Sequence, residues 1–276
     1  MNEWTKQLPA SQQALLADYQ LSWREIGQGN PVVFLHGISS SAASWVKQLA
    51  AEQLYRHYRL LAWDAPGYQQ SQPLATHQPS AKDYAQALER WLTGLSLNRV
   101  VLVGHSLGAI MASAYSALYP HKLTGLVLVD PAQGYRHASE QQRQTIYQSR
   151  VDAMTQMGPF AYAQQRAAAL LSPQTLPENV QWVKQSMQQL NPTGFLAAAW
   201  LLANEDISQY LTDYRGPLML INGEQDTITP LAQVDKLAKR LGKSITILPN
   251  AGHASYLDAP ALFNQTLSDF LQKIVN

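Results

Sequence analysis

The stretch from Arg99 to Pro120, RVVLVGHSLGAIMASAYSALYP, decides the fold of this chain. Four apolar residues lead into Gly104-His105-Ser106-Leu107-Gly108, and a helix-forming segment follows at once. A strand that meets a helix in one tight turn holds Ser106 at the apex, in a strained backbone conformation with its hydroxyl outside the core. Side chains at 104 and 108 would collide with the neighbouring strand and helix, so glycine is required at both. We interpret Ser106 as a nucleophile.

A serine hydroxyl hardly ionises near neutral pH, so Ser106 needs a base, and His253 is the best placed of the seven histidines. It follows an apolar strand predicted near 244–249 and lies in a Gly-His turn before the next helix. His36 also follows a strand, but we assign it a structural role in its loop. The other five histidines are not expected to act as the base. Four of them lie in polar contexts: His57, His77, His121 and His137. The fifth, His105, is next to Ser106 but points away from it.

The acid that orients the base is predicted to be Asp226. It lies in the loop of GPLMLINGEQDTITP, after an apolar strand over 218–221. Asp130 is the competing candidate, because it closes another apolar strand, LTGLVLVDP, and would lie on the same edge of the sheet.

Attack on a carbonyl creates a negative oxygen that two backbone N–H groups usually stabilise. One donor is expected to be Leu107, the residue after the nucleophile, which lies at the positive end of the following helix. The second is expected to be Ile38 in the loop HGISSSAASW, where His36 and Gly37 shape the turn that directs its amide.

Five motifs occur in order along the chain: HGISSSAASW, WDAPGYQQSQP, GHSLGA, NGEQD and AGHASYLDAP. Together they resemble the α/β-hydrolase superfamily, and the order Ser106, Asp226, His253 is the family's order of nucleophile, acid and base. The resemblance also keeps Asp130 open, because some relatives take their acid from its strand. Two positions depart from the family pattern. Gln69 stands where relatives carry glycine, which we expect to reshape one pocket wall, and Asp258 stands where glutamate is usual, which we expect to be tolerated.

Apolar runs alternate with helical patterns over much of the chain, which predicts an α/β fold with a mostly parallel twisted sheet and helices on both faces. The more polar segment 20–27 is predicted to form an antiparallel edge hairpin with PVVFLHG. Residues 1–133 and 211–276 are interpreted as the core domain, and 134–210 as an inserted helical cap. Candidate pocket residues are apolar or aromatic and lie mostly in the cap: Trp45, Met154, Met157, Phe195 and Trp200.

Composition excludes several classes of protein. With 276 residues, of which 46% are hydrophobic, the chain can bury a substantial core. A net charge of +1 gives no reason to expect a nucleic acid or an anionic membrane as partner. There is no cysteine, which excludes disulfides and thiolate chemistry, and no apolar run is long enough to cross a membrane. We expect a soluble, cytoplasmic protein with a small-molecule substrate and no metal or organic cofactor; its oligomeric state is not predicted.

These features favour a serine hydrolase that cleaves an ester, or a similar activated carbonyl, of a small to medium, mostly apolar substrate. A serine at position 106 argues against haloalkane dehalogenase and epoxide hydrolase activity, because relatives with those activities carry an aspartate at this turn. The alternatives with the same triad are carbon–carbon bond hydrolysis, lactone opening, amide cleavage and perhydrolysis. The segment ISSSAAS lacks the glycine and proline usual in ring-cleavage hydrolases. A ligand-binding or receptor protein on the same fold is the alternative of another class.

Overall fold

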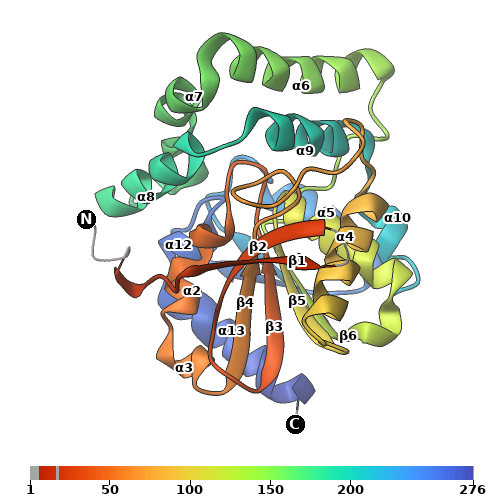
Figure 1. The fold of residues 1–276 in the computed structure, drawn as a ribbon, viewed down its shortest axis with the longest axis vertical. Coiled ribbons are helices and arrows are strands. Elements are labelled where there is room, and N and C mark those ends of the chain that lie inside the picture. The colour runs from red at the N-terminus through yellow and green to blue at the C-terminus, as the bar shows by residue number, and fades with distance from the viewer. Residues whose placement is uncertain (1–5, 17–18, 276) are drawn as a thin grey trace.

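One eight-stranded sheet organises the chain (Figure 1). The computed structural model describes residues 6–16 and 19–275. In spatial order the strands are β1 (Ser11–Leu16), β2 (Tyr19–Ile26), β4 (Tyr58–Trp63), β3 (Asn30–Leu35), β5 (Val100–His105), β6 (Leu123–Val129), β7 (Leu218–Gly223) and β8 (Ile245–Leu248). Strands β3 to β8 are mutually parallel, whereas β1 and β2 pair antiparallel with their neighbours. The predicted mostly parallel α/β architecture is confirmed.

The predicted edge hairpin differs from the observed pairing. β2 is antiparallel as expected, but it pairs with β4, where Trp23 lies opposite Trp63, and not with the PVVFLHG strand. The edge itself is formed by β1, where Ser11 pairs with Arg24. Most residues of β1 are exposed, so this strand carries no apolar signal that sequence reasoning could have used.

Helices cover both faces of the sheet (Figure 1). α4 (Ala81–Gly94) and α5 (Leu107–Leu118) pack together on one face, while α2 (Val46–Leu49), α3 (Glu52–Tyr55) and α13 (Pro260–Val275) lie on the other. α10 (Ser208–Leu211), α11 (Leu231–Leu241) and α12 (Ser255–Asp258) complete the core. α4 begins at a capping box in which the Ser80 N–H donates to Asp83 Oδ2 at 2.7 Å.

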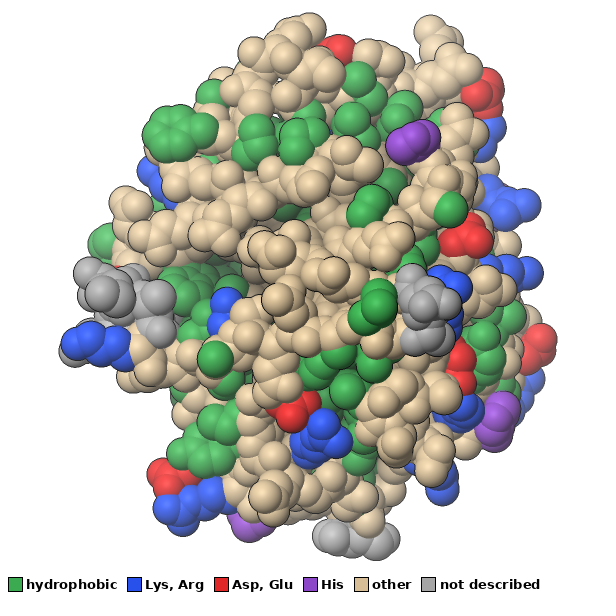
Figure 2. Space-filling model, in the orientation of Figure 1, with side chains coloured by type: hydrophobic (Ala, Val, Ile, Leu, Met, Phe, Trp, Pro, Cys, Tyr) green, Lys and Arg blue, Asp and Glu red, His purple; other side chains and the backbone are tan. Residues whose placement is uncertain are grey.

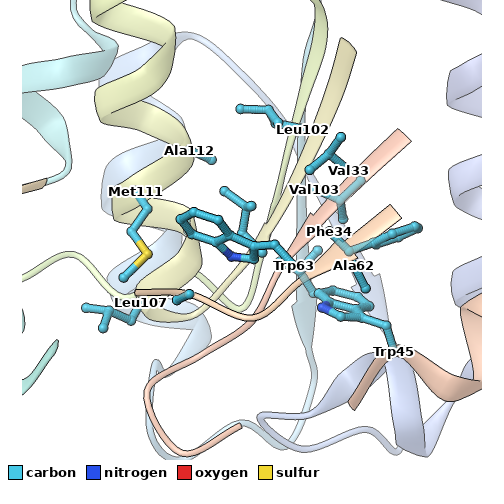
Figure 3. Packing of buried hydrophobic residues seen from close by; sticks show 14 of the residues in the cluster. Val33, Phe34, Trp45, Ala62, Trp63, Leu102, Val103, Leu107, Met111 and Ala112 are labelled. Carbon is cyan, nitrogen blue, oxygen red and sulfur yellow. The ribbon is translucent and has the colours of Figure 1, made fainter. Parts of the chain in front are cut away.

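Large aromatic side chains fill the space between sheet and helices (Figure 3). Trp63 extends from β4 toward Met111 of α5, whereas Trp45 packs on Phe34 on the other side of the strands, with ring centroids 4.9 Å apart. Every residue of β5 is buried, as expected for a strand covered on both faces. This packing fixes the end of β5, where Ser106 lies.

A helical layer lies over one end of the sheet (Figure 1). It consists of α6 (Glu140–Asp152), a π-helical turn (Ala153–Met157), α7 (Gly158–Arg166), α8 (Pro177–Gln188) and α9 (Pro192–Asn204), inserted between β6 and β7. α6 packs on α9, and α7 packs on α8. The two ends of the insertion are tied together, because the Ile207 amide donates to Gln133 O at 2.9 Å.

The surface has no dominant charge on the face shown in Figure 2, where acidic and basic side chains are interspersed. This distribution agrees with the formal net charge of +1. Within residues 6–16 and 19–275, no helix has the length and apolar character needed to span a bilayer.

Candidate active site

Ser106 lies in the turn between β5 and α5 with φ 51° and ψ −115°, a backbone conformation that L-residues rarely adopt. Two close approaches explain the flanking glycines. A Cβ on Gly104 would lie 2.5 Å from Gly108 O, and a Cβ on Gly108 would lie 2.3 Å from Leu35 O. The helix therefore starts directly against the strand backbone, and the Ser106 hydroxyl is directed out of the core into a cavity.

Three side chains predicted from the sequence meet here. His253 Nε2 lies 2.9 Å from Ser106 Oγ, and His253 Nδ1 lies 2.9 Å from Asp226 Oδ2. Because a carboxylate only accepts, Nδ1 carries the imidazole proton and Nε2 accepts the serine hydroxyl. The residues come from loops at the carboxyl ends of β5, β7 and β8, which parallel pairing brings to one edge.

The electrostatics of the pair are set by burial and by mutual attraction. Burial alone would lower the pKa of His253, but the hydrogen bond and charge of Asp226 outweigh it and raise this pKa above 6.5. Burial would likewise raise the pKa of Asp226, yet hydrogen bonds from His253 and Thr229 lower it to about 2. Asp226 is therefore ionised at neutral pH, and the imidazole is stabilised when it takes up a proton.

Sequence reasoning missed Thr229. Its Oγ1 lies 2.5 Å from Asp226 Oδ2 and 3.2 Å from His253 Nδ1, while the amides of Ile228 and Thr229 donate to Asp226 Oδ1 at 2.7 and 2.9 Å. The sequence did contain a signal for this contact. An Asp with a Thr three residues later, directly before a proline that starts a helix, is typical of a turn capped by its own side chains. This turn fixes both oxygens of the carboxylate.

Asp130, the competing acid, is buried but does not bond the His253 ring. Its Oδ1 accepts the Gly223 amide at 2.7 Å and its Oδ2 accepts Ser255 Oγ at 2.6 Å. Burial raises the pKa of Asp130 to about 8. The carboxyl thus connects the end of β7 to the loop that carries His253.

His105 is buried, and its interaction was not foreseen. Its Nε2 donates to the backbone oxygen of His253 at 2.8 Å, and burial lowers its pKa to about 3. The neutral ring of His105 thereby holds the loop that carries His253 in place.

The loop after β3 is organised by His36. Its Nε2 accepts the Ala65 amide at 3.0 Å, so its Nδ1 carries a proton and donates to Gly37 O at 2.8 Å. Burial lowers the pKa of His36 to about 4, which keeps the ring neutral. The Gly37 carbonyl and the Ile38 N–H share one trans peptide and point in opposite directions, so this bond also directs the Ile38 amide. Within the described part of the chain, neither this amide nor that of Leu107 has an acceptor.

A cavity of about 140 Å³ opens beside Ser106 between the core and the helical layer. It is comparable in size to the cavity of about 150 Å³ that holds a benzene molecule in another protein. Ser106, Ile38 and His253 line one side, and Trp182, Val183 and Leu202 contribute apolar surface.

The five candidate pocket residues lie elsewhere, four of them packed against neighbouring elements. Trp45 stacks on Tyr256 at 4.3 Å beneath the site, and Phe195 is fully buried against Tyr162. Trp200 packs on a tyrosine of α6, and Met154 is buried within the helical layer. None of the four lines the cavity, because each turns its apolar side chain to a neighbouring helix or strand. Met157 lines a second hollow between α6 and α7.

The two departures from the family pattern have structural explanations. Gln69 has φ 49°, a left-handed conformation that favours glycine, and it does not line the cavity. Asp258 Oδ2 accepts the amides of Gly252 and Ser172 at 2.9 and 2.7 Å, so the shorter acid ties the His253 loop to the helical layer. Within residues 6–16 and 19–275, no three His, Asp or Glu side chains are grouped to hold a metal ion.

Comparison with known proteins agrees with the α/β architecture. The family model described as alpha/beta hydrolase fold matches residues 30–260. Pimeloyl-acyl-carrier-protein methyl ester esterases of Vibrio vulnificus and Photobacterium profundum are 29% and 30% identical to the chain; the alignments cover 92% and 91% of it and 98% of each relative. The structure of a thermophilic esterase from Thermogutta terrifontis matches with a TM-score of 0.85 at 23% identity, covering 96% of this chain and 99% of that one. The chain therefore belongs to the α/β-hydrolase family.

Proposed function

We propose that the protein is a serine hydrolase that cleaves carboxylic esters of small to medium, mostly apolar substrates through an acyl-enzyme. The observation that carries this proposal is the continuous hydrogen-bond chain from Ser106 Oγ through His253 to Asp226. Ester chemistry is further supported by the relatives named methyl ester esterases, which align over almost their whole length.

In the proposed reaction, Ser106 Oγ attacks the ester carbonyl while His253 Nε2 takes the hydroxyl proton. The tetrahedral intermediate collapses, the C–O bond to the alcohol breaks, and His253 returns the proton to the leaving alkoxide. Water then attacks the acyl-enzyme with His253 as base, which releases the acid and restores the serine. Asp226 keeps the imidazole in the required tautomer and stabilises its protonated form.

The negative oxygen of each intermediate is proposed to accept hydrogen bonds from the amides of Ile38 and Leu107. Loss of one such donor typically costs roughly 2.7 to 4 kcal/mol in the transition state. The hydrogen bond from His36 to Gly37 O holds the Ile38 amide in place before the substrate binds. The Leu107 amide lies at the N-terminus of α5, where the helix dipole is positive.

Residues 134–210 are proposed to act as a lid. Trp182 and Val183 of α8 face the cavity and would cover the acyl or alcohol part of a substrate. Excluding water in this way strengthens the electrostatic interactions at the reacting carbonyl.

Hydrolysis of p-nitrophenyl esters from acetate to decanoate tests the proposal. Ser106→Ala is expected to lower kcat by about 10⁴-fold or more with folding intact. The matched control is Ser113→Ala, which removes a buried hydroxyl of α5 that donates to Ala109 O, and it should change kcat by less than about threefold. Full activity of Ser106→Ala would overturn the mechanism, and absence of turnover across the series would favour the ligand-binding alternative.

A further inference from the structure

The cavity beside Ser106 has a cationic part that ester hydrolysis does not require. Arg150 of α6 and Arg166 at the end of α7 both line it, together with Tyr162. No aspartate or glutamate is among the described residues that line this cavity. Since the formal net charge of the chain is only +1, this local excess is not a consequence of a generally basic surface.

Neither arginine has an acidic partner within the described ranges 6–16 and 19–275. Arg150 is half-buried, and its Nη1 donates to Ile146 O at 2.8 Å. Burial lowers the pKa of Arg150, and the charge of Arg166 acts in the same direction, so the two cations are electrostatically coupled. Arg143 on the same helix differs, because it pairs with Glu140. A partly buried cation without a counter-charge is unfavourable unless it is solvated or an anion binds, and this applies to Arg150, since Arg166 is exposed.

The arginines lie at the junction of two hollows. Arg150, Tyr162 and Arg166 line the cavity beside Ser106 and also the second hollow between α6 and α7. Asp152 lines only the second hollow, where Gln148 Nε2 donates to it at 2.8 Å.

Tyr162 connects this junction to the loop after β3 that carries Ile38. Its hydroxyl lies 3.3 Å from the hydroxyl of Ser39, the residue after Ile38. Ser106, Arg150 and Arg166 line one and the same cavity, so a single ligand in it can contact the nucleophile and the arginines, and Trp182 and Val183 give this cavity apolar surface.

We propose that Arg150 and Arg166 bind a carboxylate on the substrate, remote from the scissile ester. The inference rests on the proposed function, and it narrows the substrate class to esters that carry a second, free carboxylate. A planar guanidinium matches the two oxygens of a carboxylate in a bidentate geometry, and the apolar surface of Trp182 and Val183 in the same cavity suits a methylene chain.

The test compares matched substrate pairs. Monomethyl esters of the dicarboxylic acids from succinate to sebacate are compared with methyl esters of monocarboxylic acids of equal chain length, and ω-acetoxy acids place the carboxylate on the alcohol side instead. Wild-type protein should prefer the carboxylate-bearing member of at least one pair in kcat/KM by about tenfold or more. No preference at any length, on either side, would overturn the inference.

Variants locate the effect. Arg150→Gln and Arg166→Gln should each raise KM for the preferred carboxylate ester by about tenfold, with less than about twofold change for its neutral partner. Two variants are used because Arg150→Gln also removes the bond to Ile146 O, whereas the Arg166 side chain forms no such bond to any residue that the structure describes. The control is Arg143→Gln, which should leave both values unchanged. Equal losses on neutral and carboxylate esters would overturn the inference.

A binding measurement separates this inference from the proposed function. Calorimetry with the Ser106→Ala variant and free dicarboxylates needs no turnover, and binding should be lost when Arg150→Gln and Arg166→Gln are added. Ester turnover without a carboxylate preference would contradict only the anion site. Arginine-dependent dicarboxylate binding by a protein that hydrolyses no ester would contradict only the hydrolase proposal.

Discussion

Replacing Asp226 by asparagine tests the role of the acid without removing volume. Oδ1 of Asp226 accepts two backbone amides, those of Ile228 and Thr229, at 2.7 and 2.9 Å. The carboxamide oxygen of an asparagine must therefore occupy this position, which places its NH₂ group at the former Oδ2, facing His253 Nδ1. Nδ1 is then forced to accept, the proton moves to Nε2, and the imidazole can no longer take the proton of Ser106.

The expected cost is large because the wrong tautomer removes the base altogether. The same change in other serine hydrolase triads lowers kcat by about 10⁴, which corresponds to about 5.4 kcal/mol in the transition state. Folding should be preserved, since the backbone amides keep their acceptor and Thr229 Oγ1 can accept from the new NH₂.

Asp130→Asn is the matched control. Asp130 bonds Gly223 and Ser255 and not the His253 ring, so its replacement should lower kcat by less than about tenfold. The free energy of unfolding should change by less than about 1 kcal/mol at neutral pH, because burial raises the pKa of Asp130 to about 8 and a carboxamide resembles the neutral carboxyl. Steady-state hydrolysis of p-nitrophenyl butyrate and urea unfolding give both quantities for each variant. A larger rate loss in Asp130→Asn than in Asp226→Asn would refute this reasoning and move the acid to β6.

Three further predictions concern the base and the loops around it. Since His253 must be neutral to act, kcat/KM should fall as the pH decreases through its raised pKa, with the midpoint above 6.5, and a pH-independent profile from pH 5 to 8 would contradict this. Gly108→Ala brings a Cβ to 2.3 Å from Leu35 O, so thermal unfolding should show a loss of roughly 3 kcal/mol or more together with loss of activity; a native melting temperature would argue against the close approach. Asp258→Ala removes the acceptor of the Ser172 amide, and we expect about 1–3 kcal/mol of destabilisation with faster hydrogen exchange at that amide, whereas unchanged exchange would show that the contact does not hold the loop.

The strand–turn–helix around Ser106 was predictable because its physical requirements are local. The turn forces a positive φ on the serine and brings backbones too close for a Cβ at Gly104 and Gly108, and both constraints are visible as residue types in five consecutive positions. His253 and Asp226 were predictable for a related reason, since each follows an apolar strand and parallel strands deliver their ends to one edge.

The pocket was not predictable in the same way. Helical periodicity shows that Phe195 and Trp200 are apolar, but not whether their side chains turn to the cavity or to a neighbouring helix, which depends on how α6 and α9 pack. The arginines that line the cavity carry no periodic signal at all. Strand β1 was not predicted because its side chains are mostly exposed. Its pairing with β2 depends on backbone hydrogen bonds, which leave no pattern of residue types in the sequence.

The most direct measurement is labelling with a fluorophosphonate, which reacts with activated serines, followed by peptide mapping and residual ester hydrolysis. We expect a single adduct on the peptide that contains Ser106, turnover that falls in proportion to labelling, and no adduct in the Ser106→Ala variant. An adduct on another serine, or full turnover in completely labelled protein, would contradict the assignment of Ser106 as the nucleophile.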